Sequence, residues 1–282
     1  MRQKKRFRRL LFLLIGVFVP YLAFCYYVAN SLLCPVRTVP NRPKYFAVWE
    51  PVPKVPAWVS PSILDGSAQN VFIFSHGLHG DRAFFADTAE ALVKRGYGVV
   101  LLPMPGHDES PDKQVGFGTT ESELIRRTID ATKAKHIVLV GCSLGGASTW
   151  LASDDPRVNG VVTESAFAQL GPVSKTWFNK ILPGGDILFR PVVWALSLRL
   201  HKSPDDINPI ENAKKWDHRK PALVIHAADD QLIPIEQGKA LAEASGAEFW
   251  PVEKATHAQC QFCTKEYVDK VEGVMKRVLA KH

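Results

Sequence analysis

Short apolar runs alternate with amphipathic segments along the chain from about residue 69 to its end. Runs such as 137–140 and 223–225 are apolar at every position, as strands buried on both faces of a sheet are. The segments between them are typical of amphipathic helices. We predict strands at 71–75, 98–102, 136–141, 158–163, 222–226 and 248–251, and helices at 82–95, 119–134, 144–153, 236–244 and 264–281. This order predicts an α/β protein with a doubly wound, mostly parallel sheet.

The alternation is interrupted between the strands at 158–163 and 222–226. The connection is too long for a single crossover helix, and it is rich in aromatic and aliphatic residues. We predict that residues 171–203 form a helical cap inserted over the sheet. The alternative is a set of extra core helices with no lid role.

The N-terminal region contains a long segment without charge, from Leu10 to Leu33. As a helix its 24 residues would extend roughly 36 Å, against about 30 Å for the hydrocarbon core of a bilayer. We therefore predict an uncleaved transmembrane anchor at 10–33. A cleaved signal peptide is the competing interpretation, but its apolar region would be shorter and would end at a small-residue cleavage site.

The net charge of +7 is concentrated at the N-terminus. Residues 1–9 contain six Lys and Arg and no acid, so the remainder of the chain carries about +1. This distribution argues against a basic groove for nucleic acid. The positive-inside rule instead predicts that residues 1–9 are a cytoplasmic tail and that the domain after residue 33 lies on the extracytoplasmic side, periplasmic or extracellular.

Between the apolar segment and the first strong strand, residues 34–61 are rich in proline. We predict a stiff, extended stalk there, with one short strand at 45–49. The α/β domain then occupies residues 62–282.

Cysteine spacing gives little support to a metal site. Cys260 and Cys263 form a single C-x-x-C, whereas four-ligand zinc binding needs a second pair. The two thiols are either disulfide-bonded in an oxidising compartment or free packing residues.

Residues 141–145 read G-C-S-L-G, directly after a predicted strand and directly before a predicted helix. The G-x-S-x-G pattern in this setting places a serine on a sharp turn above the sheet. Ser143 is therefore the predicted nucleophile.

A serine hydroxyl needs a general base to act as a nucleophile. In proteins that carry this serine turn, the acid and then the histidine follow the serine along the chain. Of the downstream histidines, His257 lies in the loop between the last predicted strand and the last helix. It is the predicted base. His201 falls in the cap, His218 in a charged run, and His226 at the end of an apolar strand.

The acid should follow the penultimate strand, where Asp229 and Asp230 are adjacent. We select Asp230, with Asp229 as the first alternative and Glu164 as the second. Its carboxylate would orient the imidazole and stabilise its charged form.

The loop after the first strong strand, residues 75–80, reads S-H-G-L-H-G. Backbone amides in such a loop stabilise the oxyanion of a tetrahedral intermediate. The predicted donors are Leu78 and Leu144. We interpret His76 and His79 as packing residues.

Taken together, these motifs resemble the α/β-hydrolase superfamily, specifically its prolyl-oligopeptidase-like and lysophospholipase-like branches, over about residues 69–281. The resemblance rests on residues 76–80, on 141–146, on the strand ending at His226 followed by Asp230 and Pro234, and on Thr256-His257. Residues 105–110, P-G-H-D-E-S, are similar to a P-G-H-G-x-S loop of the family, with Asp108 in place of the second glycine.

The resemblance implies hydrolysis of esters, thioesters or amides without metal or cofactor. With a membrane anchor and an aromatic-rich cap, we expect a serine hydrolase that cleaves a carboxylic ester, with a lipid or lysophospholipid as the substrate class. The alternatives are a peptidase or thioesterase of the same fold, and a catalytically inactive binding protein that keeps the fold.

Overall fold

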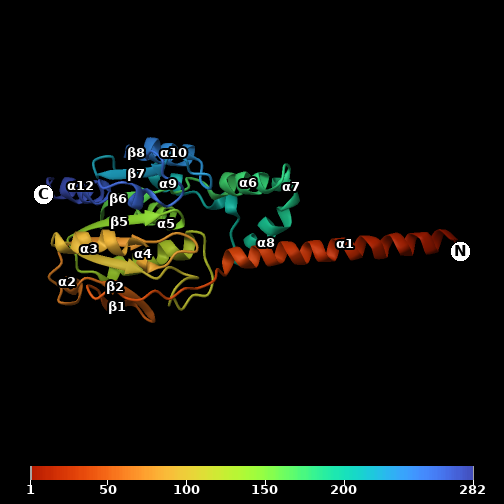
Figure 1. Ribbon diagram of the computed structural model, residues 1–282, viewed down its shortest axis with the longest axis horizontal. Helices are drawn as coiled ribbons and strands as arrows, with labels where there is room; N and C mark the ends of the chain where they lie inside the picture. Colours follow the sequence, from red (N-terminus) through yellow and green to blue (C-terminus); the bar gives the residue numbers. More distant parts are fainter. Residues whose placement is uncertain (1, 282) are drawn as a thin grey trace.

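The computed structural model describes residues 2–281; for residues 2–11, 13 and 14 only the backbone is described, so the basic side chains of the predicted tail lie outside it. A single long helix, α1 (Arg2–Leu33), projects from a layered α/β domain, and the described C-terminus lies at the far side of that domain (Figure 1). In the predicted cap, α8 (Arg190–Leu200) packs against the half of α1 nearest the domain, and α6 (Leu170–Ile181) packs against α7 (Gly185–Leu188).

The sheet has eight strands in the order β1-β2-β4-β3-β5-β6-β7-β8. Strands β3 to β8 run parallel to one another, whereas β2 pairs antiparallel with both β1 and β4. The strands are β1 (Ala47–Val52), β2 (Val55–Val59), β3 (Asn70–Ser75), β4 (Gly98–Leu102), β5 (His136–Cys142), β6 (Val158–Glu164), β7 (Ala222–Ala227) and β8 (Glu248–Val252). The predicted doubly wound, mostly parallel sheet is confirmed.

Helices cover both faces of this sheet. Successive side chains along each strand point to opposite faces, so they contribute to two hydrophobic cores, one on each face. In β5, Ile137 and Leu139 face one core while Val138 and Val140 face the other. The first core is closed by α4 (Thr119–Ala131), α5 (Leu144–Ala152), α9 (Pro209–Ala213) and α10 (Ile235–Ser245). The second is closed by α3 (Ala86–Lys94) and α12 (Tyr267–Leu279). Burial on both faces explains why these strands are continuously apolar.

The remaining elements are short, apart from two cap helices. They are α2 (Pro61–Leu64), η1 (Arg82–Phe85), α6 (Leu170–Ile181), α7 (Gly185–Leu188), α8 (Arg190–Leu200), η2 (Pro204–Asp206) and α11 (Cys260–Cys263).

The proline-rich segment differs from the stalk that we expected. Residues 47–59 form the β1–β2 hairpin, and Val55, Ala57 and Val59 are buried in the sheet's core. Pro51 is accommodated because β1 is an edge strand, where a missing N–H breaks no inner ladder, and Pro56 in β2 precedes the two residues, Trp58 and Val59, that pair with β4. The final helix also starts later than expected, at Tyr267, because the chain first forms α11.

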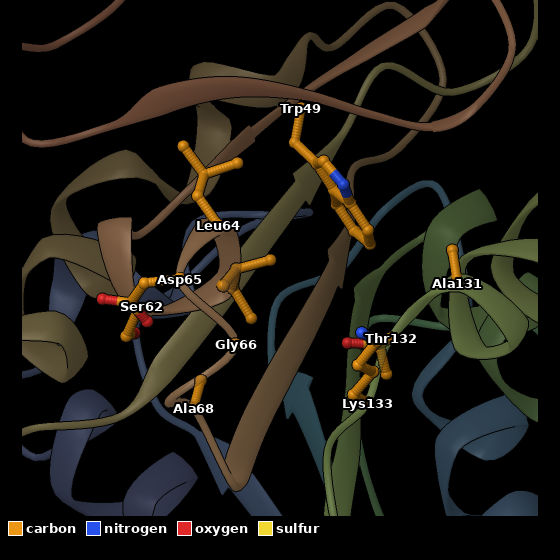
Figure 2. A pocket seen from close by; sticks show the side chains of 10 residues that line it. Trp49, Ser62, Leu64, Asp65, Gly66, Ala68, Ala131, Thr132 and Lys133 are labelled. Atoms are coloured by element: carbon orange, nitrogen blue, oxygen red, sulfur yellow. The ribbon is translucent and has the colours of Figure 1, made fainter.

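A surface pocket of about 170 Å³ lies at the amino end of the sheet, between the turn after α2 and the end of α4 (Figure 2). Trp49, Leu64 and Lys133 are among the side chains around it. Residues that follow the carboxyl ends of the strands lie at the opposite edge, so this pocket is remote from Ser143.

Close packing of α5 against the sheet depends on Gly145. A Cβ atom there would lie 2.0 Å from the backbone oxygen of Ser75 and 2.5 Å from that of His76. Real Cβ atoms do not approach backbone so closely, so a larger residue would force α5 away from β3.

We therefore expect Gly145→Ala to destabilise the fold by about 3 kcal/mol or more, the upper end of overpacking costs. Gly273→Ala in α12 is the matched control, because the nearest atom to its new Cβ is 4.0 Å away. The control should gain about 0.5–1 kcal/mol from helix propensity. Thermal denaturation of the purified protein measures both; equal stability of the two variants would contradict the packing argument.

Candidate active site

Ser143 occupies the turn between β5 and α5 with φ of 53° and ψ of −119°. A positive φ is unusual for a non-glycine residue and marks a strained turn that the surrounding structure holds in place. Its N–H donates to the backbone oxygen of Glu164 at 2.7 Å, which ties the turn to β6. The serine hydroxyl is thus presented at the carboxyl edge of the sheet, as the motif predicted.

The imidazole of His257 lies between Ser143 and Asp230. His257 Nε2 is 2.9 Å from Ser143 Oγ, and His257 Nδ1 is 2.8 Å from Asp230 Oδ2. Ser143 follows β5, Asp230 follows β7 and His257 follows β8, so three separate strand ends converge. The three residues selected from the sequence are therefore brought together.

Asp230 is fixed by its own loop. Its Oδ1 accepts hydrogen bonds from the backbone N–H groups of Leu232 and Ile233, at 2.9 and 2.8 Å, which leaves Oδ2 for His257. Burial raises the pKa of this carboxyl, but the hydrogen bond and charge of His257 and the bond from Ile233 outweigh it, so the pKa lies below the usual 3.8. Asp230 is therefore a carboxylate at neutral pH.

The two alternative acids occupy other positions. Asp229 is exposed, and its N–H donates to the backbone oxygen of Ala255. Glu164 is fully buried, with its carboxylate accepting from Tyr267 Oη and from the backbone N–H of Cys260, both at 2.8 Å. Neither carboxylate takes the place of Asp230 beside the imidazole.

Glu164 nevertheless bears on the site in a way that the sequence analysis missed. Its bond to Cys260 holds the start of α11, three residues after His257. Burial raises the pKa of Glu164, and the donors from Tyr267 and Cys260 oppose that shift. The signal available in the sequence for this role of Glu164 was its place as an acidic residue at the end of an apolar strand.

Cys260 and Cys263 are both free thiols.

The loop predicted to supply an oxyanion donor packs directly against the nucleophile. A Cβ on Gly77 would lie 3.1 Å from Ser143 Cβ, and Leu78 follows it in the chain. Leu144 is the first residue of α5, so its N–H has no acceptor within the helix. Both predicted donors are thus adjacent to Ser143 in the chain or in space.

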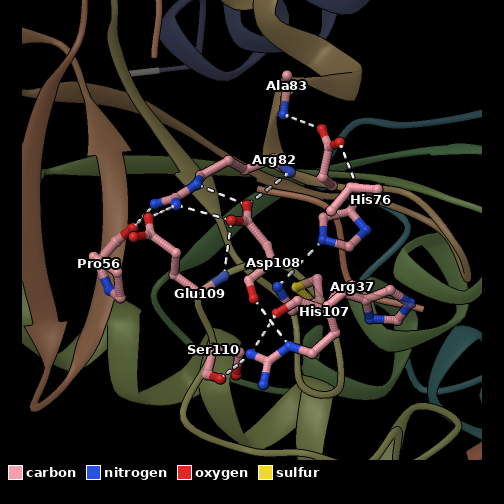
Figure 3. Close-up of polar contacts among 12 residues, drawn as sticks. Arg37, Pro56, His76, Arg82, Ala83, His107, Asp108, Glu109 and Ser110 are labelled. Carbon is pink, nitrogen blue, oxygen red and sulfur yellow. Dashed lines mark hydrogen bonds and ion pairs between the residues drawn. The ribbon is translucent and has the colours of Figure 1, made fainter. Parts of the chain in front are cut away.

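A buried polar cluster supports this loop from behind (Figure 3). Asp108 has a φ of 48° and forms a fully buried ion pair with Arg82, with Nε 2.7 Å from Oδ2. His107 Nε2 accepts from the N–H of His79 at 3.0 Å, which links residues 105–110 to the loop containing Leu78. Asp108, the departure from the family's glycine, therefore anchors its loop through Arg82. The sequence analysis missed both Arg82 and His107.

Among the residues that the structure describes, the histidines other than His257 and His107 lie in positions that give them no part in the series of Ser143, His257 and Asp230. His76 is buried, and burial together with His107 lowers its pKa to about 3, so it is neutral and accepts from the N–H of Met104. His226 Nε2 lies 3.0 Å from the backbone oxygen of Ile233. His201 and His218 are exposed. His76 therefore has the packing position that we expected, whereas His79, for which we expected the same, is exposed.

Within the described part of the chain, no group of three or more His, Cys, Asp or Glu side chains is arranged to hold a metal ion. The same region contains one helix long and apolar enough to cross a membrane, with the candidate span at Ile15–Leu33.

The sheet order, the strained serine turn and the three converging strand ends define an alpha/beta hydrolase fold. Residues 70–186 match the family described as alpha/beta hydrolase fold. No curated protein sequence matches the chain.

Solved structures with the same fold include several enzymes. The esterase Pf2001 of Pyrococcus furiosus is 20% identical, with a TM-score of 0.68 over 87% of this chain and 98% of that one. The enol-lactonase of Burkholderia xenovorans LB400 is 18% identical, with a TM-score of 0.59 over 82% and 100%. A membrane phospholipase A, described as a bacterial virulence factor, is 17% identical, with a TM-score of 0.61 over 99% of both chains. At these identities the likeness concerns the fold.

The assignment of Asp230 as the acid can be tested by substitution, with the adjacent residue Asp229 as the control. Asp230→Asn should lower kcat by about 10⁴-fold, because an amide in place of Oδ2 disturbs the imidazole tautomer. Asp229→Asn should retain near wild-type kcat, since Asp229 is exposed and away from the imidazole. Similar losses in the two variants would contradict the assignment.

The lowered pKa of Asp230 adds a pH signature to the same pair. The carboxylate stabilises the fold above the unfolded-state pKa of about 3.8, and this contribution disappears as the pH falls through the lower folded-state value. The difference in unfolding free energy between wild type and Asp230→Asn should therefore shrink below about pH 4, as measured by denaturant titration.

Proposed function

We propose that this protein is a serine hydrolase that cleaves carboxylic esters through an acyl-enzyme on Ser143. The observation that carries the proposal is the hydrogen-bonded series Ser143 Oγ, His257 and Asp230, with contacts of 2.9 and 2.8 Å. A nucleophile within reach of a base that is itself oriented by a buried carboxylate is the arrangement that acyl transfer requires.

The proposed reaction starts when His257 Nε2 removes the hydroxyl proton of Ser143 and Oγ attacks the ester carbonyl. Asp230 stabilises the resulting imidazolium through the Nδ1–H bond. His257 then donates the proton to the leaving alcohol as the C–O bond breaks. Water, activated by the same imidazole, attacks the acyl-enzyme and releases the carboxylic acid.

For the oxyanion we propose the N–H groups of Leu78 and Leu144. The proposal is supported by the position of Leu144 at the start of α5 and by the close packing of Gly77 on Ser143. Loss of one such donor costs about 2.7–4 kcal/mol of transition-state stabilisation. The ion pair between Arg82 and Asp108 would keep the Leu78 loop rigid during this step.

We infer a lipid ester as the substrate class from the apolar surroundings of the nucleophile. Leu144 belongs to an apolar cluster that includes Phe117, Phe167 and Leu170 and extends to the cap helices and to α1. A small apolar cavity lies within this region, bounded by Leu32 among others. An acyl chain fits such surroundings better than a peptide, whose amides would be left without hydrogen-bond partners.

We further propose that α1 anchors the protein in a membrane. Its apolar span and the basic residues before it favour a cytoplasmic N-terminus and a catalytic domain on the extracytoplasmic side. Residues 171–203 would then be a cap between the membrane and the carboxyl edge of the sheet.

Replacing the nucleophile tests the proposed chemistry directly. Ser143→Ala should abolish both ester turnover and labelling by a fluorophosphonate probe, because Ser143 Oγ is the hydroxyl that is paired with His257. Ser153→Ala, at the far end of α5, should leave both unchanged. Retained labelling in Ser143→Ala would exclude the assignment, whereas labelling lost in both variants would indicate misfolding.

The substrate class is tested separately with p-nitrophenyl esters of increasing chain length. We expect kcat/KM to rise from acetate toward chains of intermediate length, because each buried methylene contributes about 0.8 kcal/mol. A series in which only short esters are cleaved would exclude a lipid substrate while leaving the serine mechanism intact.

A further inference from the structure

The cap presents a cluster of exposed apolar side chains at the turn between its helices. Ile181, Leu182, Ile187 and Leu188 are 69, 47, 62 and 43% exposed, and we call residues 181–188 the cap tip. Trp194 on α8 is also exposed, at 66%. The surfaces of soluble proteins rarely have so many large apolar side chains together, so this patch indicates a site of contact with a partner.

The cap tip is held against the apolar helix. The hydroxyl of Tyr21 donates to the backbone oxygen of Leu188, and Arg199 donates to Asn30 Oδ1 at 2.7 Å. Cys25 and Ala29 are buried on the side of α1 that faces the cap. The cap therefore lies alongside residues 21–33 of α1, as Figure 1 also shows.

The position along α1 at which the cap contacts it determines whether water or lipid surrounds the cap tip. The uncharged part of the helix before the contact, from Leu10 to Tyr21, is roughly 18 Å long, whereas a hydrocarbon core is about 30 Å thick. Those residues alone cannot cross a bilayer. If α1 spans the membrane, the segment beside the cap must lie partly in the hydrocarbon, and the cap tip lies there with it.

We propose that the cap tip is inserted among the acyl chains of one leaflet, so that its partner is a lipid bilayer. This inference rests on the proposed membrane anchor and identifies the source of the proposed substrate. Ile187 and Leu188 would contact acyl chains, and the apolar cluster would lead from that leaflet to Leu144.

The backbone of the cap tip is suited to such an environment. Five N–H groups of the cap tip donate to acceptors within the cap, which is the arrangement that an environment without water favours. The donors include Leu182, Gly185, Asp186, Ile187 and Leu188.

Charges near the tip fit the surface of a bilayer. Residues 171–203 contain five Lys and Arg and one acid, Asp186, which lies within the cap tip itself. Arg190 follows the tip and is exposed, so its long basic side chain can reach lipid phosphates while its neighbours remain in the hydrocarbon. Lys180, which precedes the tip, donates instead to the backbone oxygen of Gln231.

The depth of the tip can be measured without turnover. In a Cys34→Ser, Cys263→Ser background the remaining thiols are buried, so Ile187→Cys can be labelled with the fluorophore NBD. Val48→Cys on the edge strand β1 is the control, because Val48 is 49% exposed and remote from the cap. Both proteins are reconstituted into phosphatidylethanolamine–phosphatidylglycerol vesicles and recovered by flotation.

We expect the probe at 187 to be blue-shifted and quenched by mid-chain nitroxide lipids but protected from aqueous iodide. The probe at 48 should show the reverse. Iodide quenching at 187 as strong as at 48 would overturn the proposal, and so would a chain that fails to float with the vesicles.

A second variant connects depth with catalysis. Ile187→Asp should lower hydrolysis of vesicle phospholipid by about ten-fold or more, because it replaces an apolar side chain with a second carboxylate beside Asp186 and so disfavours insertion of the tip. Hydrolysis of soluble p-nitrophenyl acetate should be unchanged, since Ile187 is outside the triad and the oxyanion loop. Unchanged vesicle hydrolysis would contradict the proposal. If the wild type cleaved neither substrate, the proposed function would fail while the depth measurement still decided the position of the cap.

Discussion

The close approach of α5 to the sheet is the constraint on which the site depends. Gly145 brings the helix onto the backbone of Ser75, and this contact forces the chain through the positive φ of Ser143. The same contact brings the loop after β3 against the nucleophile, since that loop begins at Ser75. Strain at one residue is thus stabilised by the packing of two secondary-structure elements.

Around this turn the site is assembled from parts far apart in sequence. The bond from Glu164 to Cys260 secures the segment after His257, and the pair formed by Arg82 and Asp108 secures the loop beside Leu78. Both carboxylates are buried and fully partnered, which gives each loop a single position. The polar interior therefore orients His257 and the Leu78 loop, while the apolar cluster beside Leu144 is where we propose that a substrate binds.

Much of this arrangement could be predicted from the sequence because its signals are local. Ser143 is marked by its small neighbours at a strand-to-helix junction, and the six parallel strands are marked by unbroken apolar runs. The choice of Asp230 over Asp229 followed from position alone, and the structure places the carboxylate of Asp230 beside His257.

What could not be predicted depends on contacts between distant segments. The β1–β2 hairpin was interpreted as a stalk because prolines look alike in a linker and in an edge strand, and only the partner strand β4 distinguishes them. Arg82 lies in a segment that was predicted as an ordinary helix, and its role appears only when Asp108 is placed beside it. The packing of the cap along α1 had no sequence signal at all, since apolar faces do not identify their partners.

The junction between α1 and the domain has a mechanical consequence. The N–H of Val115 donates to the backbone oxygen of Leu33 at 2.8 Å, and Leu33 itself is buried in the apolar cluster. The helix therefore ends inside the domain and not in a flexible hinge, so α1 and the domain move as one rigid body. With α1 as an anchor, any change in its tilt, such as a thinner bilayer imposes, would swing the mouth of the active site toward or away from the lipid surface.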